Sequence, residues 1–94
     1  MTRHDILTEL KKVLSPYTLD KEALANIDES TDLIKDLKIN SANLVDIIID
    51  AESKYNIEID YDAADKMVNV GGCIDVIEEK TNQQTWSLVP VMIL

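Results

Sequence analysis

The chain contains few residues whose types and spacing support catalysis or metal binding. It has one cysteine, Cys73, and one histidine, His4. A zinc site needs several such ligands at a suitable spacing, so the sequence predicts none. A Ser-His-Asp arrangement would have to use His4, which lies close to a chain end, where the backbone frays. We therefore expect neither a metal centre nor an enzyme active site.

Two further features have structural interpretations. Asp60 and Asp62 have the spacing of the first calcium ligands of an EF-hand loop, but the fifth and sixth positions are Ala64 and Asp65 in place of a ligand and a glycine. The sequence therefore predicts no EF-hand calcium site.

Cys73 has no second cysteine to pair with and lies among apolar residues at helical spacing, which predicts a small buried core residue. A single thiol without a disulfide fits a reducing compartment, so we expect a cytoplasmic protein.

One serine remains as a candidate for chemistry. Ser41 follows a long irregular segment and stands at the start of an expected helix, with acidic residues downstream. On its position alone, this serine is interpreted as a helix N-cap, as is its neighbour Asn40.

Helical periodicity predicts the elements that position Ser41. Apolar residues recur at intervals of three and four in three stretches, and a shorter stretch begins with acidic residues. We expect longer helices at about residues 2–14, 40–54 and 70–80, and a short helix at 60–67. Thr2 and Asp5 predict a capping box, and Pro16 ends the first helix.

The segments between these helices have no regular pattern. Residues 15–40 form a long connection whose scattered leucines, beginning with Leu19, predict a loop pinned onto the core, with a helical turn at 20–24. Residues 57–59 are expected to be an extended connector, since no second strand is available to pair with them. Gly71 and Gly72 interrupt the last helix, and close packing would explain them. The fold class is therefore all-α: a four-helix bundle with three longer helices, one short helix and a long loop between the first two.

Composition limits the partners of this domain. The chain has 94 residues, with 18 acidic and 9 basic side chains and a net charge of −9. Nucleic acids and anionic lipids bind through lysine and arginine, so an acidic domain repels both and favours partners with basic patches. Residues 1–80 are expected to form one domain, most simply a monomer. Residues 81–94 are an uncharged, largely apolar tail of unassigned role, too short to span a bilayer.

The residues around Ser41 resemble a known family. The stretch 36–46 (DLKINSANLVD) is similar to the acyl carrier protein pattern D-L-G-x-D-S-L-D-x-V-E, and 52–59 (ESKYNIEI) is similar to E-E-K-F-G-I-E-I. The register continues without a gap, so the resemblance covers about residues 2–80. It implies that Ser41 is the attachment site of 4′-phosphopantetheine, transferred from coenzyme A by a phosphopantetheinyl transferase. It also implies a non-catalytic protein that carries acyl groups as thioesters between enzymes of fatty acid or related biosynthesis.

The resemblance implies two further sets of residues. The surface that meets partner enzymes would comprise Asn40, Ala42, Val45, Asp46, Ile49, Asp50, Glu52, Asp62, Asp65 and Met67. A cavity for the acyl chain would be lined by Ile47, Ile48, Ala51, Ile59, Cys73, Ile74 and Ile77, which are otherwise ordinary core residues.

Three positions depart from the family pattern. Asn40 replaces the usual aspartate, Ala42 replaces the usual leucine, and the glycine expected near Lys38 is missing. These departures suggest a specialised carrier. They leave open a carrier for amino-acid, polyketide or aryl-polyene cargo, and an unmodified interaction module with the same fold.

Overall fold

The all-α fold predicted from the sequence is confirmed. The computed structural model describes residues 2–93, with side chains described as far as residue 81. Its elements are α1 (Arg3–Leu14), the 3₁₀ turn η1 (Ser15–Tyr17), α2 (Lys21–Ala25), η2 (Ser41–Asn43), α3 (Leu44–Tyr55), α4 (Tyr61–Asp65) and α5 (Val70–Ile93). The described residues form no β-strand, and the only bridge among them joins Asp32 to Asn69. The short helix α2 occupies the helical turn expected within the long connection.

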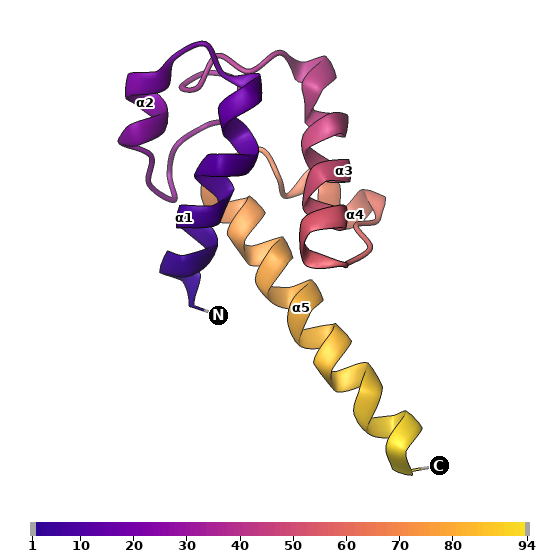
Figure 1. The fold of residues 1–94 in the computed structure, drawn as a ribbon. Coiled ribbons are helices and arrows are strands. Elements are labelled where there is room, and N and C mark those ends of the chain that lie inside the picture. Colours follow the sequence, from indigo (N-terminus) through magenta and orange to yellow (C-terminus); the bar gives the residue numbers. More distant parts are fainter. Residues whose placement is uncertain (1, 94) are drawn as a thin grey trace.

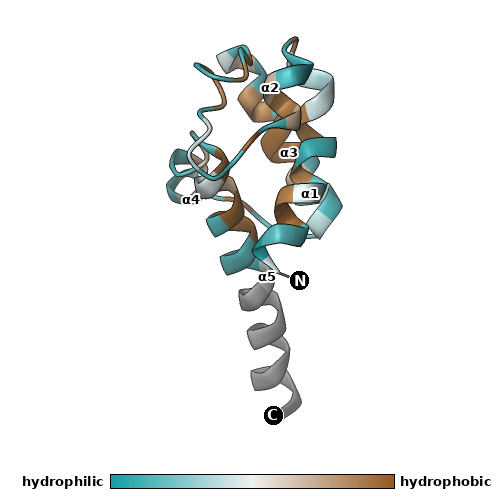
Figure 2. Cartoon of the chain, turned by 90° about the vertical axis from the view of Figure 1, so that its left-hand side faces the viewer, coloured by the Kyte–Doolittle hydropathy of each residue, from teal (hydrophilic) through white to brown (hydrophobic). Residues whose placement is uncertain are grey.

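The three longer helices pack against one another (Figure 1). α5 crosses α1 and α3, while α2 and α4 lie at the sides of the bundle. Apolar residues from all three longer helices are buried at the crossing, and the hydrophobic sides of α1 and α3 face the interior (Figure 2). The most deeply buried of these are Ile6, Leu10, Leu14, Ile47, Ala51, Val70, Cys73, Ile74, Val76 and Ile77. The apolar periodicity therefore identifies the core face of each longer helix correctly.

The predicted start of α1 is confirmed by a capping box. The Thr2 hydroxyl accepts a hydrogen bond from the Asp5 backbone N–H at 3.1 Å, and the Asp5 carboxylate accepts one from Thr2 N–H at 3.2 Å. Each bond satisfies a backbone donor at or near the helix start, which has no partner within the helix. At the other end, Pro16 lies in η1 and changes the chain direction.

The long connection is pinned onto the core, as expected. Its backbone pairs with the start of α5, since Leu33 N–H donates to Val68 O at 3.1 Å and Val70 N–H donates to Thr31 O at 2.9 Å. The buried side chains of this connection are Leu24, Ile27, Leu33, Leu37 and Ile39. The prediction is wrong for Leu19, which is 92% exposed. The neighbouring Thr18 takes the inward position because its hydroxyl donates to the Leu37 carbonyl, so Leu19 points outward.

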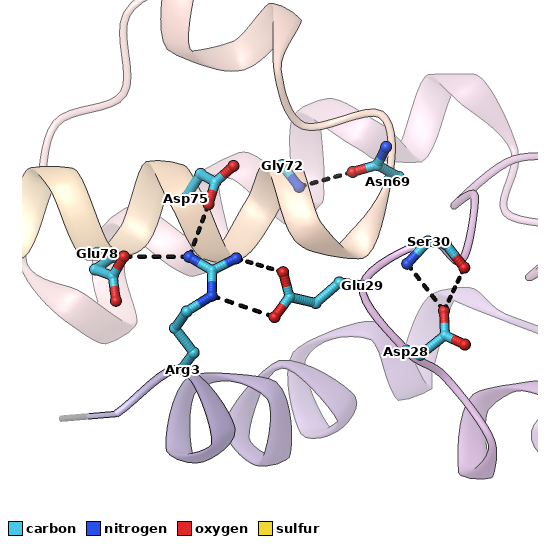
Figure 3. Close-up of polar contacts among 8 residues, drawn as sticks. All are labelled: Arg3, Asp28, Glu29, Ser30, Asn69, Gly72, Asp75 and Glu78. Carbon is cyan, nitrogen blue, oxygen red and sulfur yellow. Dashed lines mark hydrogen bonds and ion pairs between the residues drawn. The ribbon is translucent and has the colours of Figure 1, made fainter.

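An arginine cross-links the N-terminal helix to this connection and to α5 (Figure 3). The Arg3 guanidinium contacts Glu29 at 2.5 Å, Asp75 at 2.7 Å and Glu78 at 3.1 Å. These carboxylates raise the pKa of Arg3, with the hydrogen bonds to Glu29 and Asp75 as the largest causes. One cation thus neutralises acids from two separate segments.

The paired glycines mark a close approach between elements. A Cβ on Gly72 would lie 1.7 Å from the carbonyl oxygen of Lys66, and a Cβ on Gly71 would lie 2.8 Å from that of Glu29. Real Cβ atoms essentially never come closer than 3.0 Å to another heavy atom, so both positions require glycine in this packing. Close packing is therefore the reason for the two glycines.

The last helix is longer than expected. The sequence predicts an end near Lys80, whereas α5 continues to Ile93. No glycine follows Lys80, and the Thr81 hydroxyl bonds back to the Ile77 carbonyl at 2.8 Å within the helix. The side chains of residues 82–94 lie outside the described residues, and with them the role of the tail. No helix among the described residues is long and apolar enough to cross a membrane.

Candidate functional site

Ser41 is the exposed first residue of η2, at the entrance to α3. The helix start is capped by its neighbour, since Asn40 Oδ1 accepts from Ala42 N–H at 2.9 Å and the Asn40 carbonyl accepts from Asn43 N–H at 2.8 Å. Of the two N-cap candidates, Asn40 has this role. Among the described residues, no group forms a hydrogen bond with the Ser41 hydroxyl, so it has no structural task.

The segment that leads to Ser41 is held by a reversal at Lys38. Lys38 has a φ of 56°, in the left-handed region, and its neighbours Leu37 and Ile39 are both buried. Ile39 N–H donates to Leu33 O at 3.1 Å, and Thr18 holds the Leu37 carbonyl. Glycine adopts this conformation without strain, which explains why a glycine is expected here from the family pattern. The buried residues on both sides fix where Ser41 emerges.

The outer face of α3 carries apolar and acidic side chains beyond Ser41. Val45 is 60% exposed and Ile49 is 54% exposed, and Asp46 is also exposed. All three residues belong to the set that the family resemblance assigns to partner contacts. On α4, Asp62 and Asp65 are also exposed.

Two of the acids expected on this face already have partners within the chain. Asp50 accepts a hydrogen bond from the Tyr17 hydroxyl at 2.5 Å, and this bond, with burial, raises the pKa of Tyr17 to about 12. Glu52 accepts from Ile59 N–H at 2.8 Å and thereby holds the connector after α3. Among the described residues, Asp46 is therefore the α3 carboxylate without a hydrogen bond, while Asp50 and Glu52 keep further acceptor positions.

Met67 is not part of the exposed face. The family resemblance suggested an apolar contact at this position, but Met67 is only 3% exposed and belongs to the core cluster. The turn after α4 directs Met67 inward and leaves Val68 50% exposed. The expectation for Met67 is therefore wrong, while Asn40 and Ala42 are exposed.

A cavity of about 190 Å³ opens between α3, α4 and the long connection. Its lining is largely apolar and comprises Leu33, Leu44, Ile47, Ile48, Ala64, Asp65, Met67 and Val68. Leu44 lies three residues after Ser41, so the cavity begins about one helical turn from the serine.

Two residues of the predicted acyl-cavity lining border this cavity, and the others do not. Ile47 and Ile48 line the cavity, whereas Ala51, Cys73, Ile74 and Ile77 are fully buried in the core, and Ile59 packs against that core. The cavity lies nearer the start of α3 because α4 and Leu33 cover that part of the helix. Leu44 continues the apolar stripe of α3 toward Ser41, so periodicity could have found it. Leu33 lies in an irregular loop and gives no such signal.

Cys73 is confirmed as a core residue. It has 0% exposure, and burial raises the pKa of its thiol to about 12, so the thiol remains protonated near neutral pH. His4 is exposed on α1. Among the residues that the structure describes, no group of three or more His, Cys, Asp or Glu side chains is arranged to hold a metal ion.

Comparison with known proteins identifies the family. No family model matches the chain. It is 30% identical over 79 residues to the acyl carrier protein of Thermotoga maritima, covering 84% of this chain and 95% of that protein. It is 38% identical over 55 residues to the acyl carrier protein of Helicobacter pylori strain J99, covering 58% of this chain and 70% of that one.

A solved structure shares the fold. The acyl carrier protein from Enterococcus faecalis superposes with a TM-score of 0.67 and 22% identity, covering 85% of this chain and 99% of that one. The chain thus shares the small helical-bundle fold of that protein. The sequence relatives specify the kind of carrier: the chain belongs to the acyl carrier protein family.

Proposed function

We propose that 4′-phosphopantetheine is attached to Ser41 and that the loaded protein shuttles acyl groups as thioesters between enzymes of fatty acid or related biosynthesis. The observation that carries this proposal is that the Ser41 hydroxyl is accessible and not used in the fold. Its side chain is exposed at a helix entrance and has no hydrogen-bond partner among the described residues, because Asn40 performs the capping.

The residues at this site fit the modification. In the transfer from coenzyme A, Ser41 Oγ forms a bond to the phosphorus that bears pantetheine, and the phosphoanhydride bond to the adenine nucleotide breaks. The serine proton passes to a base of the phosphopantetheinyl transferase, and adenosine 3′,5′-bisphosphate leaves. This chain supplies only an accessible hydroxyl on an anchored segment. The carrier itself needs no catalytic group.

The cavity beside Leu44 supports transient shelter of the acyl chain. It is apolar, opens about one turn from Ser41, and is bordered by Ile48 and Met67. Burying apolar surface there stabilises a bound chain by about 25 cal/mol per Å² removed from water. The acyl chain would leave the cavity when a partner enzyme offers it a stronger binding site.

The exposed face of α3 supports recognition by enzymes with basic patches. Asp46 supplies a free carboxylate near Ser41, with Asp62 and Asp65 further along, and Val45 and Ile49 supply the apolar contacts. Such charges mainly steer the encounter and set specificity. A cytoplasmic monomer is the form that we expect to meet these partners.

The test is intact-mass measurement after co-expression with a broad-specificity phosphopantetheinyl transferase. The wild-type protein should gain the mass of one phosphopantetheinyl group, and Ser41→Ala should gain none. Ser53→Ala is the matched control, because Ser53 is also exposed and lies on α3; it should be modified like the wild type. An unmodified wild type, or an adduct that survives Ser41→Ala, would overturn the proposal. The mass spectrum of protein purified from its own host would in addition report the cargo.

A further inference from the structure

The sequence segment around Ser41 differs in charge from the rest of the protein. The whole chain has a net charge of −9, but residues 34–49 contain two lysines and two aspartates. One of these aspartates, Asp36, accepts a hydrogen bond from Asp32 N–H at 2.7 Å. Lys35 and Lys38 are exposed, and neither forms an ion pair within the described part of the chain. The excess of acid therefore lies outside this segment.

Lys38 is the free cation nearest to the serine in the sequence. Three residues of chain separate the two Cα atoms by at most about 11 Å. The flexible lysine side chain can bring its ammonium closer to Ser41 than this Cα distance, to within about one screening length of a negative charge on Ser41 at physiological ionic strength. A lysine also occupies a left-handed position, with a φ of 56°, that glycine fills more easily. Non-glycine residues in such conformations cluster at functional sites.

Asn40 places a hydrogen-bond donor beside the same serine. Its Oδ1 is held by Ala42 N–H at 2.9 Å, which leaves Nδ2 as the uncommitted polar group of this side chain. An amide nitrogen donates hydrogen bonds and carries no charge. An aspartate at this position would cap the helix equally well but would bring a negative charge next to the attachment point.

We propose that Lys38 and Asn40 form a seat for the phosphodiester on Ser41, with the Lys38 ammonium as its counter-ion and Asn40 Nδ2 as its hydrogen-bond donor. This inference rests on the proposed modification of Ser41. The seat offsets the cost of adding one more negative charge to an already anionic domain. We expect the ion pair and the hydrogen bond to outweigh this cost, so that attachment of the arm raises the stability of the folded protein.

The test compares melting temperatures of unmodified and phosphopantetheinylated protein, for the wild type and three variants. Lys38→Met removes the counter-ion. Asn40→Asp is isosteric and keeps the cap acceptor. Lys12→Met is the matched control, since Lys12 is an exposed lysine without an ion pair on α1. Each variant is compared with its own unmodified form, so its direct effect on folding cancels.

Modification should raise the melting temperature of the wild type and of Lys12→Met by the same amount. Lys38→Met and Asn40→Asp should each lose at least half of this gain, and the wild-type gain should shrink as salt is added. Phosphoserine installed at position 41 during translation gives a second comparison without any transferase; it is a monoester with a charge of about −1.5 to −2, so Lys38→Met should again lose at least half of the gain. Equal gains in Lys38→Met and Lys12→Met, or no gain in the wild type, would overturn the seat alone. A wild type that accepts no arm would overturn the proposed function as well.

Discussion

Replacing Gly72 by alanine tests the packing that brings α4 against α5. In an exposed helix, alanine is more stable than glycine by about 1 kcal/mol, so helix propensity alone predicts that Gly72→Ala stabilises the protein. The tertiary structure predicts the opposite sign. The new Cβ would lie 1.7 Å from the Lys66 carbonyl oxygen, whereas ordinary contact begins at 3.4 Å.

The size of the effect follows from what has to move. The obstructing atom belongs to the backbone after α4, so no side-chain rotation relieves the contact. Overpacking of this kind costs about 1–3 kcal/mol, and a contact at half the ordinary separation belongs at the upper end. After subtraction of the propensity gain, we expect a net loss of about 2 kcal/mol. For a domain of this size, that loss lowers the melting temperature by about 8–16 °C.

Thermal and urea denaturation followed by circular dichroism measure this loss. Gly71→Ala should destabilise the protein less, because its Cβ would lie 2.8 Å from Glu29 O, an atom in a loop that can shift. Ser53→Ala is the control for propensity, since Ser53 is exposed on α3 and alanine should stabilise it slightly. An unchanged or raised stability of Gly72→Ala would refute the reasoning.

Three further predictions concern charges and backbone strain. Arg3→Met should lower the melting temperature at neutral pH. Because Arg3 lowers the pKa of Glu29, the difference in melting temperature from the wild type should be present above about pH 4.3 and should disappear as the pH falls through the lowered pKa of Glu29. A difference that persists at the lowest pH would contradict this. The phenolate absorbance of Tyr17 should appear near pH 12, and Asp50→Asn should bring this transition closer to pH 10. The hydrogen bond from Tyr17 to Asp50 contributes its full stabilisation below about pH 10, and this contribution is lost as the pH rises through 12. Lys38→Gly should stabilise the unmodified protein against urea by about 0.5–1 kcal/mol, because the strain removed from the left-handed backbone outweighs the larger loss of conformational entropy that glycine suffers on folding. Lys38→Met should give no such gain.

Local signals in the sequence were sufficient for the helices and for the serine. The apolar stripes identified the core faces of α1, α3 and α5, and the capping box marked the start of α1. The residues around Ser41 indicated the family, and the comparisons confirm it. These signals act over a few residues, so they survive in a single sequence.

The end of α5 and the placement of two residues were predicted incorrectly. Leu19 is exposed because Thr18 takes the inward position, and Met67 is buried because the turn after α4 directs it into the core. In irregular segments, apolar residue type alone does not determine which side chain faces inward. Backbone hydrogen bonds and neighbouring elements make that choice.

The sequence by itself determined the fold class, the attachment candidate Ser41 and the anionic character of the protein, because periodicity, motif register and charge are properties of the chain. The tertiary structure decided which of those residues remain available. The Tyr17 hydroxyl and the Ile59 N–H donate to Asp50 and Glu52, so Asp46 is the α3 carboxylate without a hydrogen bond among the described residues. Leu33 and α4 place the cavity beside the start of α3. Both outcomes depend on contacts between segments far apart in the chain, and no local pattern records which segments will meet.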